Sequence, residues 1–348
     1  KYEIIPIGIS AEGRWLSSPD AVRLLKERTH LRDQPEKILL PDPARRGLVE
    51  PDAKQGRAGP AGAAARHRLD VIFPVLHGTF GEDGTVQGLF ELAGIPYVGA
   101  GVLGSAAGMD KVVTKQLCEH EGIPVTPYCW FLADEYRAES KKILSVIEKN
   151  LGYPCFVKPA NLGSSVGISK AHDRNELLRA VNLAARYDRK ILVEKSIEGA
   201  REIEVGVLGN DDPAASVPGE IISSNEFYDY DAKYVDGKSH AIIPADLPEP
   251  ATRKLQEFAV RSFKAIDCAG MARVDFLVSK RTRTLYFNEI NTIPGFTSIS
   301  MYPKLWEASG VPYPRLLDRL IELALGRSRG RQVLRTTFKP KSDWYRDG

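Results

Sequence analysis

Two short runs in the carboxy-terminal part of the chain constrain its fold more than any other feature. They are Arg273-Val-Asp275-Phe and Asn288-Glu289-Ile-Asn291, and the polar, basic segment 279–284 separates them. We predict that the runs form the two strands of a hairpin, with a turn near residues 281 and 282 that brings Asp275 opposite Glu289. Side chains alternate between the two faces of a strand, so the arginine and aspartate of the first run share a face. The glutamate and the second asparagine of the other run lie together, about 6.7 Å apart along the strand.

This pattern gathers hard oxygen ligands and one cation on a single face, with no histidine or thiol among them. Such ligands suit Mg²⁺, whose shell is usually completed by substrate phosphates and waters; Mn²⁺ is the alternative ion. Two ions about 3.5–4 Å apart could share Glu289. Alternation also assigns Leu285 and Phe287 to the face of Glu289. The alternative interpretation is a surface hairpin with solvated charges, because charged alternation is common on exposed strands.

Length and composition indicate an ordinary globular protein. The 348 residues suffice for two or three domains with sizeable cores, and 43% are hydrophobic and 27% charged. The formal charge of +3 is small for this length, so we expect neither nucleic acid nor a membrane as partner, and the substrate has to be inferred from the candidate sites. There is no apolar run of about 18 residues and no signal-peptide pattern at the start, which indicates a cytoplasmic protein.

The four cysteines are scattered among apolar neighbours without paired spacing: Cys118, Cys129, Cys155 and Cys268. We interpret them as buried free thiols rather than as disulfides, zinc ligands or a catalytic nucleophile. Their chemistry therefore suggests no function.

Apolar runs, caps and turn residues predict strands alternating with helices, as in an α/β protein. We expect strands at 4–9, 69–76, 95–98, 154–158, 191–197 and 200–208, of which 69–76 is buried on both faces. We expect helices at 18–27, 85–93, 109–120, 140–150 and 174–187, with Ser140 as an N-cap. Residues 99–108 are expected to form a joint of small residues, and 41–68 a flexible excursion without regular elements.

Two glycine-rich loops follow predicted strands. The first, residues 77–84, lies where open α/β sheets bind ligands, so His77 is a candidate substrate contact; a histidine that only caps the strand is the alternative. The second contains Gly163, Ser164, Ser165 and Gly167, whose backbone N–H groups and hydroxyls could surround phosphate oxygens. It has the spacing of neither a P-loop nor a Rossmann fingerprint, and a plain turn is the alternative.

Two further segments are candidates for nucleotide contact and for a lid. Glu194 and Lys195 end a strand after three apolar residues, which is expected of a strand end that offers its backbone to an adenine ring, or of an ordinary exposed strand end. Residues 226–234 mix aromatic and charged side chains, which predicts a long functional loop or lid rather than a buried element.

Taken in order, these segments resemble the D-alanine–D-alanine ligase family of the ATP-grasp superfamily, from Lys1 to about Leu325. The motifs that carry the resemblance are His77-Gly-Thr-Phe-Gly-Glu-Asp-Gly84, Met109-Asp-Lys111, Val157-Lys158-Pro, Gly163-Ser164-Ser165-Val-Gly167, Glu194-Lys195, Arg201-Glu202-Ile-Glu204, Tyr228-Asp-Tyr-Asp-Ala-Lys233-Tyr234, Arg273-Val-Asp275 and Asn288-Glu289-Ile-Asn291-Thr-Ile-Pro-Gly295.

The resemblance implies an α/β fold of the ATP-grasp type with three domains, of which the first is an open α/β sheet domain that lacks its first strand, and it implies a homodimer. The expected parts are an amino-terminal substrate domain at 1–104, a central ATP-grasp subdomain at 105–197, a carboxy-terminal subdomain with the metal site at 198–327, and a disordered tail at 328–348. The implied reaction joins two D-alanines for peptidoglycan synthesis. One carboxylate attacks the γ-phosphate of ATP, and the amine of the second D-alanine displaces phosphate from the D-alanyl phosphate.

The resemblance also implies a role for each matching residue. ATP contacts are Lys111, Lys158, Gly163, Ser164, Ser165, Val166, Glu194, Lys195, Ile197, Glu202, Phe227, Lys233 and Phe287. D-Alanine contacts are His77, Arg273, Gly295, Ser300 and Met301. Catalytic groups are Arg273, which donates to the oxyanion, with Ser164, Lys233 and the lid residue Tyr234. Two Mg²⁺ ions are held by Asp275, Glu289 and Asn291.

Family members begin with an earlier strand and a Gly-Gly-x-Ser-x-Glu-His-x-Val-Ser segment, whose glutamate helps to hold the ammonium of the first D-alanine. This sequence opens at what resembles the second strand, and we expect the segment to precede Lys1 rather than to be lacking by nature. The rival readings are a ligase that makes D-alanyl-D-serine or D-alanyl-D-lactate, and a nucleotide-binding protein without ligase activity. Tyr234 matches the lid tyrosine of dipeptide-forming members, which argues against D-lactate.

Overall fold

The fold is described from a computed structural model, for residues 1–348 except 11, 18–35, 50–66, 164, 223–239 and 336–348. The chain divides into two compact units, Lys1–Ile72 with Gly88–Pro96, and Phe73–Gln87 with Tyr97–Gly348. It mixes helices and strands, so the predicted α/β class is confirmed. The helix predicted at 18–27 and the lid predicted at 226–234 lie outside the described residues.

The first unit contains two small antiparallel sheets. One pairs β1 (Ile7–Ile9) with β2 (Trp15–Ser17), and the other has the order β3-β4-β5, formed by Ile38–Leu39, Gly47–Val49 and His67–Arg68. The strand predicted at 4–9 is thus limited to its last residues. Because β4 and β5 fall within 41–68, the prediction of a segment without elements is wrong for them.

The strand predicted at 69–76 is not formed. Two N–H groups of this run donate to carbonyls of other segments, Leu69 to Arg46 at 3.0 Å and Ile72 to Pro96 at 2.8 Å, and these isolated bonds do not make a ladder. Val75 is 55% exposed, so the run is not buried on both faces. Pro74 has no N–H to give to a ladder, which is a physical reason for the interruption. Residues 95–98 likewise form none of the named strands.

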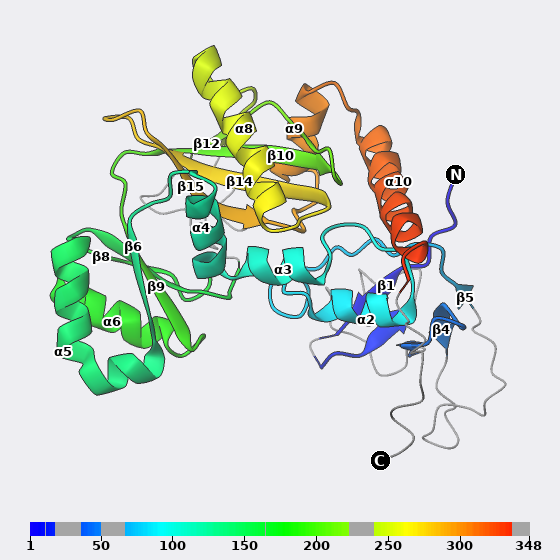
Figure 1. The fold of residues 1–348 in the computed structure, drawn as a ribbon, viewed down its shortest axis with the longest axis horizontal. Coiled ribbons are helices and arrows are strands. Elements are labelled where there is room, and N and C mark those ends of the chain that lie inside the picture. Colours follow the sequence, from blue (N-terminus) through cyan, green and yellow to red (C-terminus); the bar gives the residue numbers. More distant parts are fainter. Residues whose placement is uncertain (11, 18–35, 50–66, 164, 223–239, 336–348) are drawn as a thin grey trace, which may run out of the picture. The chain divides into compact units, whose positions relative to one another are not determined.

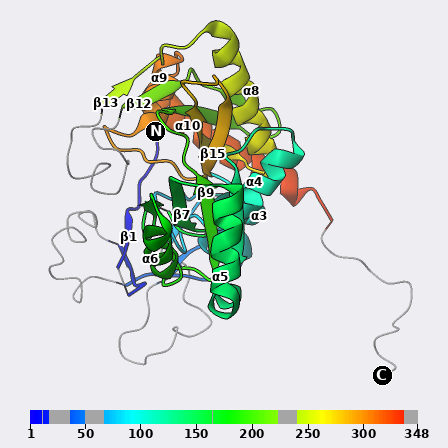
Figure 2. The ribbon, with the colours of Figure 1, turned by 90° about the vertical axis from the view of Figure 1, so that its left-hand side faces the viewer.

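The second unit holds a four-stranded sheet of order β6-β9-β7-β8, made of Tyr128–Leu132, Lys190–Lys195, Cys155–Pro159 and Ser169–Ala171. Helices α5 (Ala133–Asn150) and α6 (Arg174–Ala184) lie side by side on one face, as Figure 2 shows. Alternation sends Val157 and Val193 into that helical layer. It therefore sends Lys158 and Glu194 to the opposite face, toward α4 (Lys111–His120).

Helix α5 begins earlier than predicted. It is interrupted at Glu139, whose φ of −128° and ψ of 39° are not helical, and the predicted helix 140–150 is the part that follows this kink. The strands predicted at 154–158, 191–197 and 200–208 appear, with small shifts, as β7, β9 and β10.

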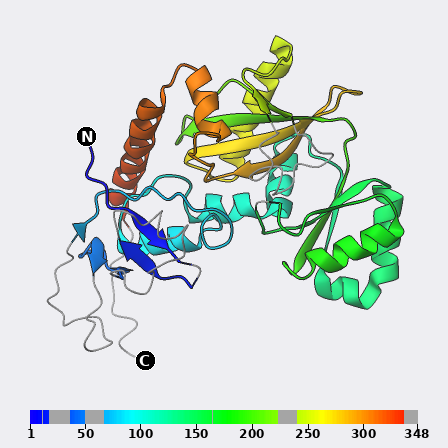
Figure 3. The same cartoon turned by 180° about the vertical axis from the view of Figure 1, so that it is seen from behind.

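The second sheet of this unit has the order β13-β12-β10-β14-β15, with β11 paired to β10. Its strands are His240–Ile242, Gly219–Ile222, Arg201–Gly209, Gly270–Val278, Leu285–Asn291 and, for β11, Ala214–Ala215. Helix α8 (Glu249–Ala265) packs on one face over Val205 and Val274 (Figure 1). Helix α9 (Met301–Ala308) covers the other face, which Figure 3 shows from behind. The Tyr302 hydroxyl of this helix donates to the Val207 carbonyl at 2.9 Å.

The predicted joint at 99–108 contains a helix, α3 (Val102–Met109), and that prediction is corrected. Its glycines permit close packing rather than a loop. A Cβ at Gly104 would lie 2.8 Å from the Asp267 carbonyl oxygen, and one at Gly108 would lie 2.9 Å from a methyl carbon of Thr292. Helix α2 (Thr85–Ala93) forms where it is predicted.

Helix α10 (Tyr313–Gln332) runs past residue 328, so the expected tail begins too early. Arg327 in its last turns donates to the backbone carbonyls of Tyr97, at 3.0 Å, and Gly99. In the described part of the chain, no helix is both long and apolar enough to cross a membrane.

The cysteines are free, and all but Cys129 are buried. Burial raises the pKa of Cys118 and of Cys155 to about 11. These two thiols are therefore protonated at neutral pH. The prediction of buried free thiols is confirmed for Cys118, Cys155 and Cys268, whereas Cys129 is half-buried.

Candidate functional site

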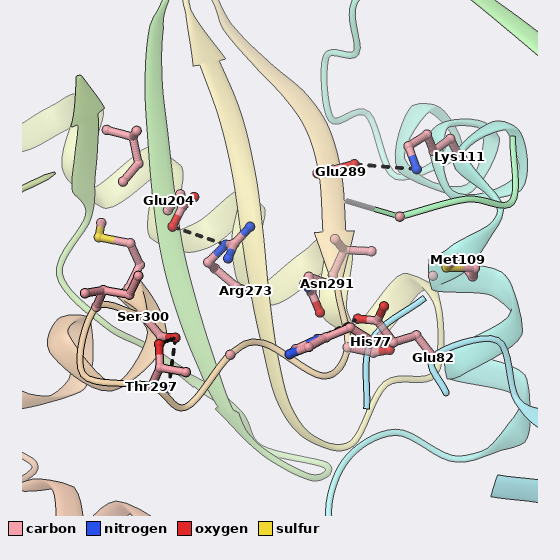
Figure 4. A pocket seen from close by; sticks show the side chains of 18 of the residues that line it. His77, Glu82, Met109, Lys111, Glu204, Arg273, Glu289, Asn291, Thr297 and Ser300 are labelled. Carbon is pink, nitrogen blue, oxygen red and sulfur yellow. Dashed lines mark hydrogen bonds and ion pairs between the residues drawn. The ribbon is translucent and has the colours of Figure 1, made fainter. Parts of the chain in front are cut away.

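A pocket of about 430 Å³ lies within the second unit (Figure 4). It is bordered by β14, β15, the start of α4, the loop that holds His77 and the segment before α9. Many of the predicted site residues line it: His77, Lys111, Gly163, Arg273, Glu289, Asn291, Gly295, Ser300 and Met301. Residues from distant parts of the sequence thus meet at one cavity.

The hairpin has the register predicted for its charged residues. Asp275 pairs with Glu289 and Arg273 with Asn291. A β-bulge follows, because Phe276 pairs with Phe287 and leaves Asn288 as the extra residue. The bulge reverses the alternation, so Leu285 and Phe287 face the core and not the side of Glu289, contrary to the prediction.

The bulge also decides where Phe287 lies. Its ring is fully buried in the core, 6.2 Å from that of Phe276 and 5.9 Å from the Lys115 Nζ atom. Asn288 turns toward the site instead, with its side-chain oxygen 3.4 Å from the Lys158 Nζ atom.

Arg273 lies between two carboxylates, and we call these three residues the arginine cluster. Its Nε and Nη2 atoms donate to the two oxygens of Asp275 at 2.8 and 2.7 Å, and Nε lies 3.2 Å from a Glu204 oxygen on β10. Burial opposes the charge on Arg273, but Asp275 and Glu204 outweigh this and raise its pKa well above the usual value. The guanidinium is therefore permanently charged.

The expected metal ligands offer only oxygen donors. Glu289 and Asn291 line the pocket, and Asp275 lies across the strand pair from Glu289. Among the described residues, no group of three His, Cys, Asp or Glu side chains could hold a metal ion by itself. Two carboxylates and one amide still fit Mg²⁺, because that ion usually takes one or two carboxylates and completes its shell with waters and phosphate oxygens.

The lysines form a second charged group, which we call the lysine cluster: Lys115, Glu194 and Lys158. Lys115 Nζ is 2.5 Å from one oxygen of Glu194, and Lys158 pairs with the other. Burial alone would raise the pKa of Glu194, but the two ammonium groups outweigh it and lower that pKa far below its usual value. Burial lowers the pKa of Lys115, whereas Glu194 and Glu289 outweigh burial at Lys158 and raise its pKa.

Lys111 stands at the start of α4, one helical turn before Lys115. Asp110 caps the helix by accepting from the backbone of Val112 and Val113 at 3.0 and 3.1 Å. The Lys111 Nζ atom donates to the Leu162 carbonyl at 2.7 Å and lies 3.6 Å from a Glu289 oxygen. One lysine thus contacts both the loop that precedes Gly163 and the hairpin.

The other predicted residues are distributed around the pocket. The imidazole Nδ1 of His77 is 4.0 Å from a Glu82 oxygen. Ser300 precedes α9 and accepts from the Thr297 N–H at 3.0 Å, and a Cβ at Gly295 would lie 2.6 Å from its hydroxyl. In the loop before β8, Ser165 has a φ of +58° and Val166 is 38% exposed.

Several predicted residues are not at this pocket or cannot be placed. Lys195 ends β9 and is exposed, Ile197 follows it, and Glu202 lies on β10; none of the three lines the pocket. Ser164, Phe227, Lys233 and Tyr234 lie outside the described residues.

The sequence reading missed three residues that shape the site: Lys115, Glu204 and Glu82. Lys115 had a signal, because it follows Lys111 by one helical turn and shares a face with Cys118. A lysine on a buried face requires a carboxylate, which is found in Glu194. Glu82 accepts from the Gly78 N–H within its own loop, and nothing in the pattern distinguishes it from Asp83.

Comparisons with known proteins find relatives over most of the chain. Residues 1–100 match the family described as D-ala D-ala ligase N-terminus, and residues 117–322 match D-ala D-ala ligase C-terminus. The D-alanine–D-alanine ligase of Acetivibrio thermocellus is 51% identical over 94% of this chain and 88% of its own length.

Two solved structures share the fold. The D-alanine-D-alanine ligase from Coxiella burnetii has a TM-score of 0.78 at 38% identity, over 94% of this chain and 85% of that one. The VanG D-Ala:D-Ser ligase from Enterococcus faecalis has a TM-score of 0.79 at 37% identity, over 93% and 90%. Backbone similarity therefore does not separate ligases with different second substrates.

Proposed function

The chain belongs to the D-alanine–D-alanine ligase family, and from this premise we propose that it is an ATP-dependent ligase that joins two D-alanines for peptidoglycan synthesis. The observation that carries the proposal is the meeting of Lys111, Arg273, Glu289 and Asn291 at one pocket. A lysine, a buried arginine and oxygen ligands are what phosphoryl transfer followed by acyl transfer requires.

In this proposal Lys111 and Lys158 hold the nucleotide phosphates, and the loop from Gly163 to Gly167 covers them. Lys111 is supported by its place between Leu162 and Glu289, from which its ammonium can reach a bound anion without leaving the pocket. Adenine and ribose would lie along the end of β9 and at Glu202. This arrangement leaves the reacting carboxylate near the hairpin.

Asp275, Glu289 and Asn291 are the residues that would hold a divalent cation, Mg²⁺ or Mn²⁺. When bound, the ion neutralises charge on the phosphate oxygens. Arg273 remains charged whatever the pH of the assay and can donate to the oxyanion that forms when the amine attacks. Ser300 and Met301 border the same pocket, where the carboxylate of the second D-alanine would bind.

A second candidate function is the formation of D-alanyl-D-serine, because a D-Ala:D-Ser ligase has the same fold at a TM-score of 0.79. The two functions differ in the second substrate only.

We further propose that the protein is a homodimer in the cytoplasm.

The proposed function is tested by phosphate release from ATP and Mg²⁺ in the presence of D-alanine, D-serine or D-lactate. We expect release that depends on D-alanine, with D-alanyl-D-alanine identified by mass spectrometry. If D-alanine and D-serine are supplied together and the product is D-alanyl-D-serine, the second candidate is favoured. Nucleotide binding without release under any of these conditions would contradict ligase activity.

Glu289→Gln tests the hairpin as the metal site. Loss of one charged ligand should lower turnover by about 10²–10³-fold, the range found when one electrostatic contact to the transition state is removed. Titration with Mn²⁺ should show weaker metal binding in the variant. Unchanged turnover and unchanged metal affinity would mean that Glu289 holds no ion.

A further inference from the structure

Lys115 has contacts that the proposed reaction does not explain. Its side chain is 1% exposed, and it does not line the pocket. Its Nζ atom lies 2.5 Å from Glu194, 3.1 Å from the Thr126 hydroxyl and 3.2 Å from the Asn288 carbonyl oxygen. An ammonium has three protons to donate, and three acceptors from three separate segments receive them.

The first of these contacts leads to the phosphate-binding lysine. Thr126 and Lys115 both donate to the same Glu194 oxygen, at 2.8 and 2.5 Å, so that oxygen is held from two sides. The other oxygen of the carboxylate is thereby directed at Lys158. Lys158 and Glu194 lie on the same face of neighbouring strands, β7 and β9.

The contact with Asn288 leads to the hairpin. Asn288 is the extra residue of the bulge and precedes Glu289, and its side-chain oxygen lies 3.4 Å from the Lys158 Nζ atom. Lys115 therefore holds the backbone at the point where the alternation of β15 reverses. One ammonium joins the four-stranded sheet, through Glu194, to the strand that carries the expected metal ligand.

We infer that Lys115 is a positioning residue for nucleotide binding, which sets the Lys158 ammonium through Glu194 and the bulge before Glu289 through the Asn288 carbonyl. This inference rests on the proposed function, in which Lys158 binds nucleotide phosphate and Glu289 binds the divalent cation. Lys115 is too deeply buried to touch the nucleotide itself. Its effect is expected on the affinity for nucleotide rather than on that for D-alanine.

The experiment replaces Lys115 by Met, which keeps an unbranched side chain and removes the ammonium. Arg327→Met is the matched control, because Arg327 is also a cation that holds two backbone carbonyls, those of Tyr97 and Gly99. Affinity for a non-hydrolysable ATP analogue with Mg²⁺ is measured by calorimetry, without D-alanine. The KM values for ATP and for D-alanine, and the melting temperature, are measured alongside.

We expect Lys115→Met to bind the analogue about 10–100-fold more weakly, as when a residue that orients a ligand-binding group is lost. Its KM for ATP should rise much more than its KM for D-alanine. Arg327→Met should lower the melting temperature with unchanged nucleotide affinity. A folded Lys115→Met protein with unchanged affinity and KM for ATP would overturn the inference and assign Lys115 to stability alone.

If Lys115→Met does not fold, Thr126→Val decides the matter, because it removes only the hydroxyl that helps to hold Glu194. Weaker analogue binding in this variant supports the positioning of Lys158 through Glu194, and unchanged binding overturns it. The wild-type turnover with D-alanine is a separate readout. Binding of the analogue without D-alanine-dependent turnover would contradict the proposed ligase and leave the binding test of Lys115 intact.

Discussion

The two charged clusters at this site have opposite compositions. The lysine cluster shares one carboxylate, Glu194, between Lys115 and Lys158, whereas the arginine cluster shares one guanidinium, Arg273, between Glu204 and Asp275. Positive charge is in excess in the first and negative charge in the second. Phosphate oxygens suit the first cluster, and a divalent cation or an ammonium suits the second.

The central residue of each cluster is also the one whose charge the structure fixes most firmly. Two opposite charges lower the pKa of Glu194 and raise that of Arg273, in both cases against the effect of burial. The two outer members of each cluster share the central one as an oppositely charged partner. Removal of a central residue therefore leaves two like charges buried together, which is the costly case for an ion pair.

The largest effect is expected from Arg273→Met. It should lower turnover by about 10²–10³-fold through loss of the oxyanion donor, and the free energy of unfolding by about 3–5 kcal/mol because Glu204 and Asp275 lose the cation that they share. Urea denaturation and the phosphate-release assay measure the two effects. Arg273→Met with wild-type stability would show that the arginine cluster is not held as the structure indicates.

Glu194→Gln is the corresponding change in the lysine cluster. It should lower the free energy of unfolding by about 3–5 kcal/mol at neutral pH, because Lys115 and Lys158 lose their shared carboxylate. Turnover should fall less than in Arg273→Met, since no group that contacts reacting atoms is removed. The nucleotide affinity of the folded fraction should fall because Lys158 is no longer oriented.

The pH dependence distinguishes the two variants. The pKa of Glu194 is lower in the folded protein than its usual value of 4.5, so its contribution to stability is complete above that pH and is lost as the pH falls toward the folded pKa. The stability difference between wild type and Glu194→Gln should therefore narrow below about pH 4.5. Raising the pH should also favour Glu194→Gln, because its unpaired lysines can lose a proton, and should give Arg273→Met no such gain. Urea denaturation of wild type and of both variants, measured below pH 4.5, at neutral pH and at alkaline pH, tests both statements.

The strand pairing at the arginine cluster could be predicted, whereas the contacts that join the members of the lysine cluster could not. Alternation and a turn near residues 281 and 282 predicted the pairing of Asp275 with Glu289, which the structure has, but not the bulge that lies between this pair and the turn. At the bulge, two residues of β15 lie opposite one residue of β14. The alternation pattern of a single strand does not contain this information. Phe287 was assigned to the wrong face for this reason.

Contacts across elements account for the other differences. Glu204 reaches Arg273 from a strand about 70 residues away, and Lys115 meets Glu194 and Asn288 only after two sheets are formed. Periodicity within a segment cannot identify such partners. The glycines of α3 gave a different error. Gly104 and Gly108 led to the prediction of a joint without regular structure, whereas in the structure they allow a helix to pack closely.

The smallest effect on stability is expected at the ion pair of Arg201 with Glu220, which lies on the sheet that carries the arginine cluster and has balanced charge. Arg201 donates to both oxygens of Glu220, at 2.8 and 2.6 Å, and each side chain is less than a fifth exposed, at 17% and 12%. Because the two charges of this hydrogen-bonded pair balance, replacing both residues by apolar ones, Arg201→Met with Glu220→Leu, leaves neither of them behind. The free energy of unfolding should stay within about 1 kcal/mol of wild type or rise, and turnover should be unchanged.

The single change Arg201→Met serves as its control, because it leaves the Glu220 carboxylate buried and alone. It should be less stable than the double variant, and urea denaturation of the two proteins measures the difference. If the double variant were instead as unstable as Arg273→Met, burial of charge rather than its imbalance would determine the cost. The contrast between the two clusters would then lose its energetic meaning, although their opposite charge would still orient the ligands.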